Sequence, residues 1–159
     1  MNTFEQSYLG QLRAAFGSRK LIAPGVRAII TDQEGQILFI RRRDNAQWAL
    51  PAGGIELDES VLDALRREVE EETGLHVVKA TLSAIYSEPR FSYTNMYGNE
   101  HQMLSFEFRV DEWTGTVARE TEETTDLGFF PVDTLPTTSP VYLESIQDFL
   151  AYDGEVVLK

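Results

Sequence analysis

The stretch GGIELDESVLDALRREVEEETGL, residues 53–75, contains six glutamates and two basic residues. Ser60 precedes its apolar repeat as a helix N-cap does, and Asp63 completes an approximate capping box. Gly74 follows the repeat as a C-cap. Between these caps, apolar side chains recur at every fourth position, at Val61, Leu65 and Val69. The spacing predicts one amphipathic helix between Ser60 and Gly74.

Three glutamates occupy positions where their charges destabilise this helix. At about 100° per residue, Glu72 falls in the core-facing sector, and Glu68 and Glu71 line its edge. Carboxylates in the last turn oppose the helix dipole by about 0.3–1 kcal/mol each, and like charges repel more strongly when partly buried. A bound divalent cation would offset both costs. Because carboxylate oxygens are hard ligands, the predicted ion is Mg²⁺, with Mn²⁺ as a substitute.

The other charged residues of the helix are spaced as ordinary ion pairs. Asp63 and Arg67 stand four residues apart, as do Arg66 and Glu70. Side chains at this spacing meet on the helix surface. We therefore expect both pairs on the outer, solvated face.

Composition places the chain among globular proteins. Its 159 residues are 42% hydrophobic, which is enough for one domain with a core. The formal net charge of −12 argues against nucleic acid polymers or anionic membranes as partners. The chain has no cysteine, which excludes disulfides and thiolate metal sites. No apolar run approaches the roughly 18 residues of a membrane span or resembles a signal peptide, so the predicted location is the cytoplasm.

The rest of the chain predicts strands and helices around the acidic helix. Residues 24–33 and 36–43 are expected to pair as a β-hairpin across a Glu34-Gly35 turn. Further strands are expected over residues 76–88, 100–110, 114–118 and 127–132. Helices are expected over residues 4–16, within an N-terminal segment 1–19, and 139–151. This order predicts one domain, residues 1–159, of the α/β or α+β class with a mixed sheet.

The acidic segment closely resembles the box that characterises the Nudix hydrolases. That signature is Gly, five residues, Glu, seven residues, and then Arg-Glu-aliphatic-any-Glu-Glu-any-Gly-aliphatic. Its nine constrained positions are met in this chain by Gly53, Glu59, Arg67, Glu68, Val69, Glu71, Glu72, Gly74 and Leu75. The Trp-x-Leu-Pro entry at residues 48–51 and the FFPVDTLP stretch at residues 129–136 also resemble small bacterial, MutT-type members.

The resemblance implies a fold and a reaction. The fold is an α/β/α sandwich around a mixed sheet, with the box as a loop–helix–loop. The reaction is hydrolysis of the pyrophosphate bridge of a nucleoside diphosphate linked to a group X, by attack of water at phosphorus. Nucleotide sugars, ADP-ribose, CDP-alcohols and nucleoside triphosphates are all candidate substrates. The resemblance also implies a small nucleotide as partner and a homodimer, because small relatives commonly form one.

Two other functions share this fold. The first is a nucleotide-binding module that does not cleave its ligand; such members usually have a degraded box, whereas this one is intact. The second is a prenyl diphosphate isomerase, whose chemistry generally recruits a cysteine that this chain lacks.

Residue roles follow from the resemblance position by position. The implied metal ligands are the Gly53 carbonyl and the carboxylates of Glu59, Glu68, Glu71 and Glu72. For Glu59 the alternatives are ligation through water or pairing with Arg67. The implied catalytic residues are Arg67, Glu68, Glu71 and Glu123, and the general base is open among the three glutamates because family members differ. Glu122 competes with Glu123 for the later-loop role.

Substrate-binding residues are predicted in two places. Strand alternation sends Arg42 to one face and Arg41 and Arg43 to the other, so only part of this run can reach phosphates; we name Arg41 and Arg42 as candidates. Phe91 and Tyr93 could stack on a base, with core packing as the alternative.

One position departs from the common pattern of the family. Many relatives have glycine immediately before the first box glutamate, where this chain has Asp58. The substitution adds a charge beside the predicted site. We expect it to affect the loop that precedes the helix.

Overall fold

The computed structural model describes residues 3–159, so the first two residues of the predicted N-terminal segment lie outside it. Its helices are α1 (Tyr8–Phe16), α2 (Val61–Thr73) and α3 (Pro140–Leu150), with short 3-10 turns η1 (Phe4–Gln6) and η2 (Pro89–Phe91). Its strands are β1 (Leu21–Ile30), β2 (Ile37–Arg42), β3 (Trp48–Ala49), β4 (Ala52–Gly54), β5 (Leu75–Tyr86), β6 (Tyr93–Thr94), β7 (Glu100–Gly115), β8 (Thr124–Phe130) and β9 (Val157–Leu158).

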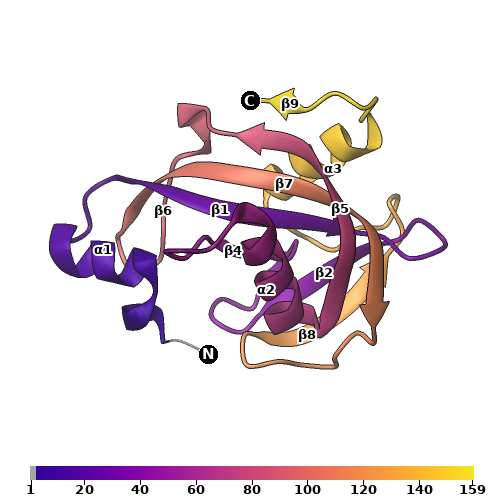
Figure 1. Cartoon of the computed structure of the whole chain (residues 1–159), viewed down its shortest axis with the longest axis horizontal. Coiled ribbons are helices and arrows are strands. Elements are labelled where there is room, and N and C mark those ends of the chain that lie inside the picture. The colour runs from indigo at the N-terminus through magenta and orange to yellow at the C-terminus, as the bar shows by residue number, and fades with distance from the viewer. Residues whose placement is uncertain (1–2) are drawn as a thin grey trace.

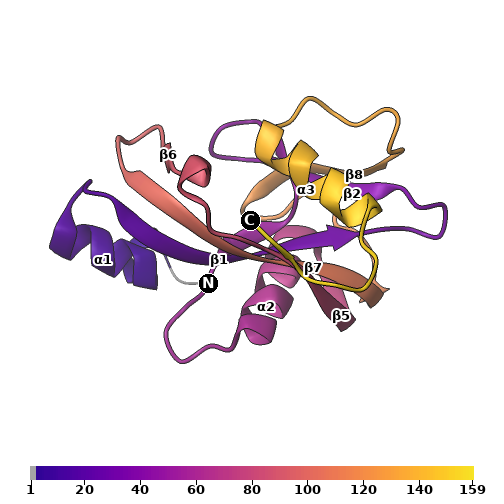
Figure 2. The ribbon, with the colours of Figure 1, turned by 90° about the horizontal axis from the view of Figure 1, so that it is seen from above.

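The strands form two sheets (Figure 1). The larger runs β4-β1-β7-β5-β9, with β6 against β7. It is mixed, because β1 pairs with β7 and β5 with β9 in parallel, while the other pairs are antiparallel. The smaller sheet, β3-β2-β8, is antiparallel. Helices α2 and α3 lie on opposite sides of the larger sheet (Figure 2). The predicted mixed sheet between helices is confirmed.

Alternation along β1 supplies both faces of the core. Val26, Ala28 and Ile30 belong to a cluster that includes Leu65 and Val69 of α2. Ile29 points the other way and packs in a second cluster with Ile146 of α3. Each fully buried aliphatic side chain of this size contributes about 1.5–3 kcal/mol. The core therefore lies on both faces of β1, and α2 packs on one of them through Leu65 and Val69.

The predicted β-hairpin between the first two long strands is wrong. Strands β1 and β2 belong to different sheets and meet at the isolated bridge Thr31–Ile37. Both edges of β1 are occupied, by β4 and β7. The Asp32 carboxylate accepts hydrogen bonds from the backbone N–H groups of Glu34 and Gln36. This turn redirects the chain into the second sheet, where β2 pairs with β8.

The strands differ from the sequence-based prediction in two further respects. The strand expected over residues 114–118 is the end of β7, which continues to Gly115 because that residue pairs with Leu75 at the start of β5. Residues 116–118 are not in a strand. Strand β9 was not predicted; its two residues pair with β5 and are too short to give a periodic signal. None of the helices within residues 3–159 has both the length and the apolarity to cross a bilayer.

The predicted caps of α2 are confirmed. Ser60 Oγ accepts a hydrogen bond from the Asp63 N–H at 3.1 Å. Gly74 adopts φ +76°, the left-handed conformation that favours glycine at a helix C-terminus. These caps set where α2 begins and ends. They therefore also set the direction in which the glutamates of its last turn point.

Candidate active site

Two glutamates of α2 are buried against β4. Glu72 is 1% exposed and Glu68 8% exposed. The Ala52 N–H donates to Glu72 Oε2 at 2.9 Å, which ties this carboxylate to the strand. A Cβ atom at Gly53 would collide with the Glu68 carboxyl group. Glycine at position 53 therefore gives the Glu68 carboxylate its place beside the strand.

A third carboxylate comes from the loop before β8. One oxygen each from Glu68, Glu72 and Glu123 lies within 4.8 Å of the other two. The Glu123 backbone N–H donates to Thr121 Oγ1. The Arg43 backbone N–H also donates to the Glu123 carbonyl oxygen at 2.9 Å. The loop is thus held so that Glu123 meets the end of α2. We call Glu68, Glu72 and Glu123 the carboxylate cluster.

The electrostatics of the carboxylate cluster favour a bound cation. Burial raises the pKa of Glu68 to about 7, although Arg67 opposes the shift. Burial, together with the Glu68 charge, raises the pKa of Glu72. Burial and nearby Glu71 raise the pKa of Glu123. Three converging hard oxygen donors with disfavoured charges fit a divalent cation such as Mg²⁺.

Arg67 joins the box loop to the helix. Its Nε lies 2.7 Å from Glu59 Oε1, and its Nη1 lies 2.6 Å from Glu68 and 3.2 Å from Glu71. Its Nη2 donates to the Gly54 carbonyl at 2.9 Å. Hydrogen bonding from Arg67 lowers the pKa of Glu59. The guanidinium therefore crosslinks β4, the loop and α2 at the site.

These contacts replace the outer-face pairs expected from spacing. The Glu59–Arg67 pair is present, whereas Arg67 turns away from Asp63, which instead lies 3.5 Å from Arg66. Glu70 lies 3.6 Å from His76. Helical periodicity could not predict this, because it says nothing of the loop that folds over the same face.

Asp58 adopts φ +61° in the loop that precedes α2. Glycine adopts this left-handed conformation without steric cost, and aspartate is one of the few other residues that tolerate it. The loop therefore keeps a glycine-like turn in spite of the substitution. One residue later, Glu59 Oε2 accepts from the Glu56 N–H at 3.0 Å.

A cavity of about 510 Å³ opens beside the carboxylate cluster. Of the arginine run, Arg42 lines this cavity. Its Nη1 lies 3.8 Å from Glu72 Oε1, and it forms a bidentate pair with Asp44. Arg41 does not line the cavity; its Nε donates to the Ala46 carbonyl. The structure thus places Arg42 at the cavity and Arg41 away from it, while the role of each in binding stays a prediction.

The two aromatic candidates have different surroundings. Tyr93 lines the cavity and is 49% exposed, with its ring stacked on His101 at 4.8 Å between centroids. Phe91 is buried and packs edge-on against Tyr86, outside the cavity lining. Phe91 therefore belongs to the core, which was the alternative to base stacking. Tyr93 stays a candidate for stacking on a base.

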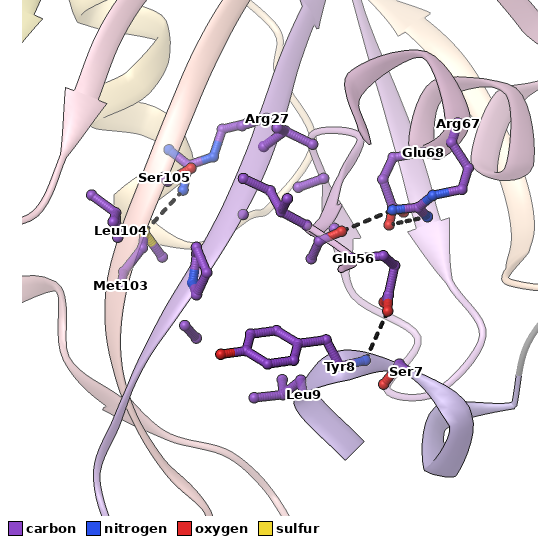
Figure 3. Close-up of a pocket in the computed structure, with 18 of the residues that line it drawn as sticks. Ser7, Tyr8, Leu9, Arg27, Glu56, Arg67, Glu68, Met103, Leu104 and Ser105 are labelled. Atoms are coloured by element: carbon purple, nitrogen blue, oxygen red, sulfur yellow. Dashed lines mark hydrogen bonds and ion pairs between the residues drawn. The ribbon is translucent and has the colours of Figure 1, made fainter. Parts of the chain in front are cut away.

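Several lining residues were not predicted from the sequence. They come from several elements and are Tyr8, Leu9, Leu12, Arg27, Met103 and Tyr142 (Figure 3 shows the first two, Arg27 and Met103). Arg27 carried a usable signal, since it interrupts the apolar strand LIAPGVRAII. Burying a charge is costly unless it is paired, so an arginine there implies a partner or a ligand. The other residues look like ordinary core positions in a sequence.

A mixed sheet between helices, with buried glutamates on a loop–helix–loop, is the arrangement of the Nudix class of fold. The family model described as NUDIX domain matches residues 21–149. The chain therefore belongs to the Nudix family.

Curated relatives match part of the chain. A MutT-like protein of Streptomyces ambofaciens is 39% identical over 79 residues, which is 50% of this chain and 51% of that protein. An RNA pyrophosphohydrolase of Pseudomonas putida is 48% identical over 52 residues, which is 33% of each chain. The chain thus matches about half or less of the length of these relatives.

Solved structures match more of it. A MutT NUDIX hydrolase of Burkholderia pseudomallei has a TM-score of 0.66 at 25% identity, over 82% of this chain and 98% of that one. An ADP-ribose pyrophosphatase of Streptococcus suis has a TM-score of 0.61 at 22% identity, over 87% and 100%. The second likeness shows the fold alone.

Proposed function

We propose that this protein is a Mg²⁺-dependent hydrolase of the pyrophosphate bridge in a nucleoside diphosphate linked to a group X. The observation that carries the proposal is the carboxylate cluster at one end of the cavity, beside the guanidinium of Arg42. Membership of the Nudix family supports the reaction class. The name of one curated relative, an RNA pyrophosphohydrolase, supports a pyrophosphate bridge as the bond cleaved.

Glu68, Glu72 and Glu123 are the residues we propose to hold Mg²⁺, and Mn²⁺ would substitute in the same oxygen set. The Gly53 carbonyl is a further proposed ligand, because β4 runs beside Glu68. Both Glu59 oxygens already accept hydrogen bonds within the protein, so its proposed role is to anchor the loop or to ligate through water. A bound divalent ion lowers the pKa of attacking water and neutralises the bridge.

The remaining side chains bind and orient the substrate or move a proton. Arg42 offers a positive charge to the phosphates, and Tyr93 offers a ring face to a base. Glu71 and Glu68 each accept a hydrogen bond from Arg67, so our proposed general base is Glu123, with one carboxylate oxygen for the ion and the other for the proton of the attacking water. Arg67 acts by holding Glu59 and Glu68 in place.

The test is a panel of nucleotides incubated with Mg²⁺, with the products identified. We expect a nucleoside monophosphate and phosphorylated X from at least one compound, and loss of turnover in Glu72→Gln. The proposal fails if no compound is hydrolysed. Tight binding of a nucleotide by calorimetry, with no product after long incubation, would instead favour the non-cleaving binding module.

The base assignment has its own test. The pH dependence of kcat/KM reports the base of the free enzyme. Glu123→Gln should remove the acidic limb of that profile, whereas Glu71→Gln should lower the rate and keep the limb. The reverse result would assign the base to Glu71.

We further propose a cytoplasmic homodimer. The absence of cysteine fits a reducing compartment. Exposed apolar residues of the N-terminal region, Phe4, Phe16 and Ile22, are available for contact with a second copy. Sedimentation at micromolar concentrations tests the assembly, and a monomer across that range would refute it.

A further inference from the structure

The cavity beside the carboxylate cluster is lined by residues from both faces of the larger sheet. Side chains along β7 alternate between the two faces of the sheet. Met103 packs in the cluster on the α3 side, and Phe106 and Phe108 pack on the α2 side. Leu104 therefore points to the α2 face, and yet Met103 and Leu104 both line the same cavity. We call the two parts the α3 branch and the α1 branch.

The α3 branch carries positive charge and aromatic rings. Arg27 is 2% exposed, lies 3.6 Å from Glu107 and sits 5.1 Å from the ring centroid of Tyr142. Its Nε is buried without a hydrogen-bond partner among the described residues. Arg42 also lines the cavity, and Tyr93 stacks on His101, which alternation places on the same face of β7 as Met103. Because Glu107 matches the Arg27 charge, Arg42 and the Tyr93 ring are what suit this side to the nucleotide half of a substrate.

The α1 branch is mainly apolar and has a different origin in the chain. Tyr8, Leu9 and Leu12 of α1 are half-buried and line it together with Ile55 and Leu104. Figure 3 shows the Tyr8 side chain pointing from α1 toward β1. These α1 residues precede residue 21, where the match to the family model begins. The match to the family model therefore does not describe the α1 side of this branch.

The α1 wall is held rigidly. The Tyr8 backbone N–H donates to Glu56 Oε2 at 2.7 Å (Figure 3). Arg13, which is buried, donates to the carbonyl oxygens of Arg19 and Glu100, each at 2.6 Å. A Cβ atom at Gly10 would collide with the Phe4 carbonyl oxygen, so α1 also packs closely on η1. A preformed wall binds a ligand with little ordering cost.

We propose that the α1 branch is the subsite for X, and that X is an uncharged group with an apolar or planar face. The proposal rests on the proposed function. A further phosphate in this branch would lie near the carboxylate of Glu56 and against aliphatic side chains, which disfavours it. A sugar or a second nucleoside would pack against Tyr8 and Leu12. The preferred substrates are therefore nucleoside diphosphates linked to an organic group, and nucleoside triphosphates are poor substrates.

The experiment compares three substrates that share the best-hydrolysed nucleoside and differ in X. These are the nucleoside triphosphate, the corresponding diphosphate-linked sugar and the symmetrical dinucleoside diphosphate. The expected kcat/KM is lowest for the triphosphate and highest for the compound with the planar X. In Tyr8→Ala, kcat/KM for the dinucleoside diphosphate should fall about tenfold, the scale of one aromatic stacking contact. The value for the triphosphate should change less than about twofold.

Two further variants make the result decisive. Leu12→Lys places a cation in the α1 branch and should raise kcat/KM for the triphosphate relative to the diphosphate-linked sugar, whatever Tyr8→Ala does to folding. Gln11→Ala, at an exposed position of the same helix, should leave all three values unchanged. Equal losses on all substrates in Tyr8→Ala, or a wild type that prefers the triphosphate, would overturn the subsite. Failure of the wild type to hydrolyse any of the three, or any of the wider panel, would count against the proposed function itself.

Discussion

The protein buries glutamates at two places, and their surroundings differ. Glu107, on β7, is 0% exposed and lies 3.6 Å from Arg27, with the Ser145 hydroxyl donating to it. Glu72, on α2, is 1% exposed and lies among other carboxylates, with Arg42 only at 3.8 Å. One buried charge has a cationic partner built into the fold. The other is arranged with like charges, an arrangement that a cation from outside would stabilise.

This difference separates a structural glutamate from a functional one. Desolvation raises the pKa of both carboxylates, and the nearby Arg27 opposes the shift at Glu107. Burial alone therefore does not identify a site. What distinguishes the carboxylate cluster is the convergence of several oxygens on one point beside a cavity.

Replacing Glu72 should give the largest effect. In Glu72→Gln the amide oxygen can still accept from Ala52, but a proposed metal ligand is lost. Turnover should fall about a thousandfold or more. A bound metal ion contributes several kcal/mol to transition-state stabilisation, and each 1.36 kcal/mol lost is about a tenfold loss of rate. The metal-free variant should melt at a higher temperature than the wild type, since a buried charge is removed.

Phosphorylated-product release and thermal unfolding without metal measure the two effects. Glu107→Gln is the matched control for turnover, because it removes a buried carboxylate outside the carboxylate cluster. An active Glu72→Gln would abolish the contrast between the two glutamates.

Breaking the structural pair should come next. Arg27→Met leaves the buried Glu107 carboxylate without its partner, at a cost of about 3 kcal/mol or more. The double variant Arg27→Met/Glu107→Leu should recover most of that loss, because the unpaired charge is gone. Urea unfolding of the three proteins measures this. A single variant as stable as the wild type would show that Arg27 does not stabilise the buried Glu107 charge.

Loosening the box crosslink should have a smaller effect on turnover. Arg67→Ala removes the contacts to Glu59, Glu68 and the Gly54 carbonyl. Residues that orient metal ligands typically change activity about 10–100-fold, so we expect a drop in that range. Arg66→Ala, one residue earlier on the outer face, should be close to wild type. Equal effects of the two substitutions would contradict the crosslink.

The pH dependence of stability should show the smallest effect. Burial raises the folded pKa of Glu107 above the ordinary glutamate value of 4.5, while the nearby Arg27 cation opposes and limits the shift. The folded state therefore binds more protons just above that value, and stability falls modestly as pH rises from about 4.5. Glu107→Gln should show a shallower decline above that pH. Parallel stability curves for the two proteins would show that the pKa of Glu107 is the same in the folded and unfolded states.

The sequence predicted the acidic helix well because its information is local. Ser60, Gly74 and the apolar repeat specify where α2 begins and ends, and the position of Glu72 on the wheel follows from 3.6-residue geometry. Its burial follows from that position. The predicted strands were also mostly present, since alternation and turn residues are local signals.

Long-range partners were not predictable in the same way. The separation of β1 and β2 into two sheets depends on β4 and β7 occupying both edges of β1. The inward turn of Arg67 depends on a loop that returns over the helix. Tyr8 enters the cavity because α1 is fixed by Glu56 and Glu100, which are distant in sequence. None of these contacts leaves a periodic trace.

The central claim is that the carboxylate cluster holds the divalent cation on which hydrolysis depends. Calorimetric titration of Mg²⁺ into the wild type and into Glu72→Gln tests this without reference to the substrate. We predict saturable binding to the wild type and its loss in Glu72→Gln, with Glu107→Gln binding as the wild type does. Absence of saturable binding to the wild type, or equal binding to all three proteins, would contradict the claim.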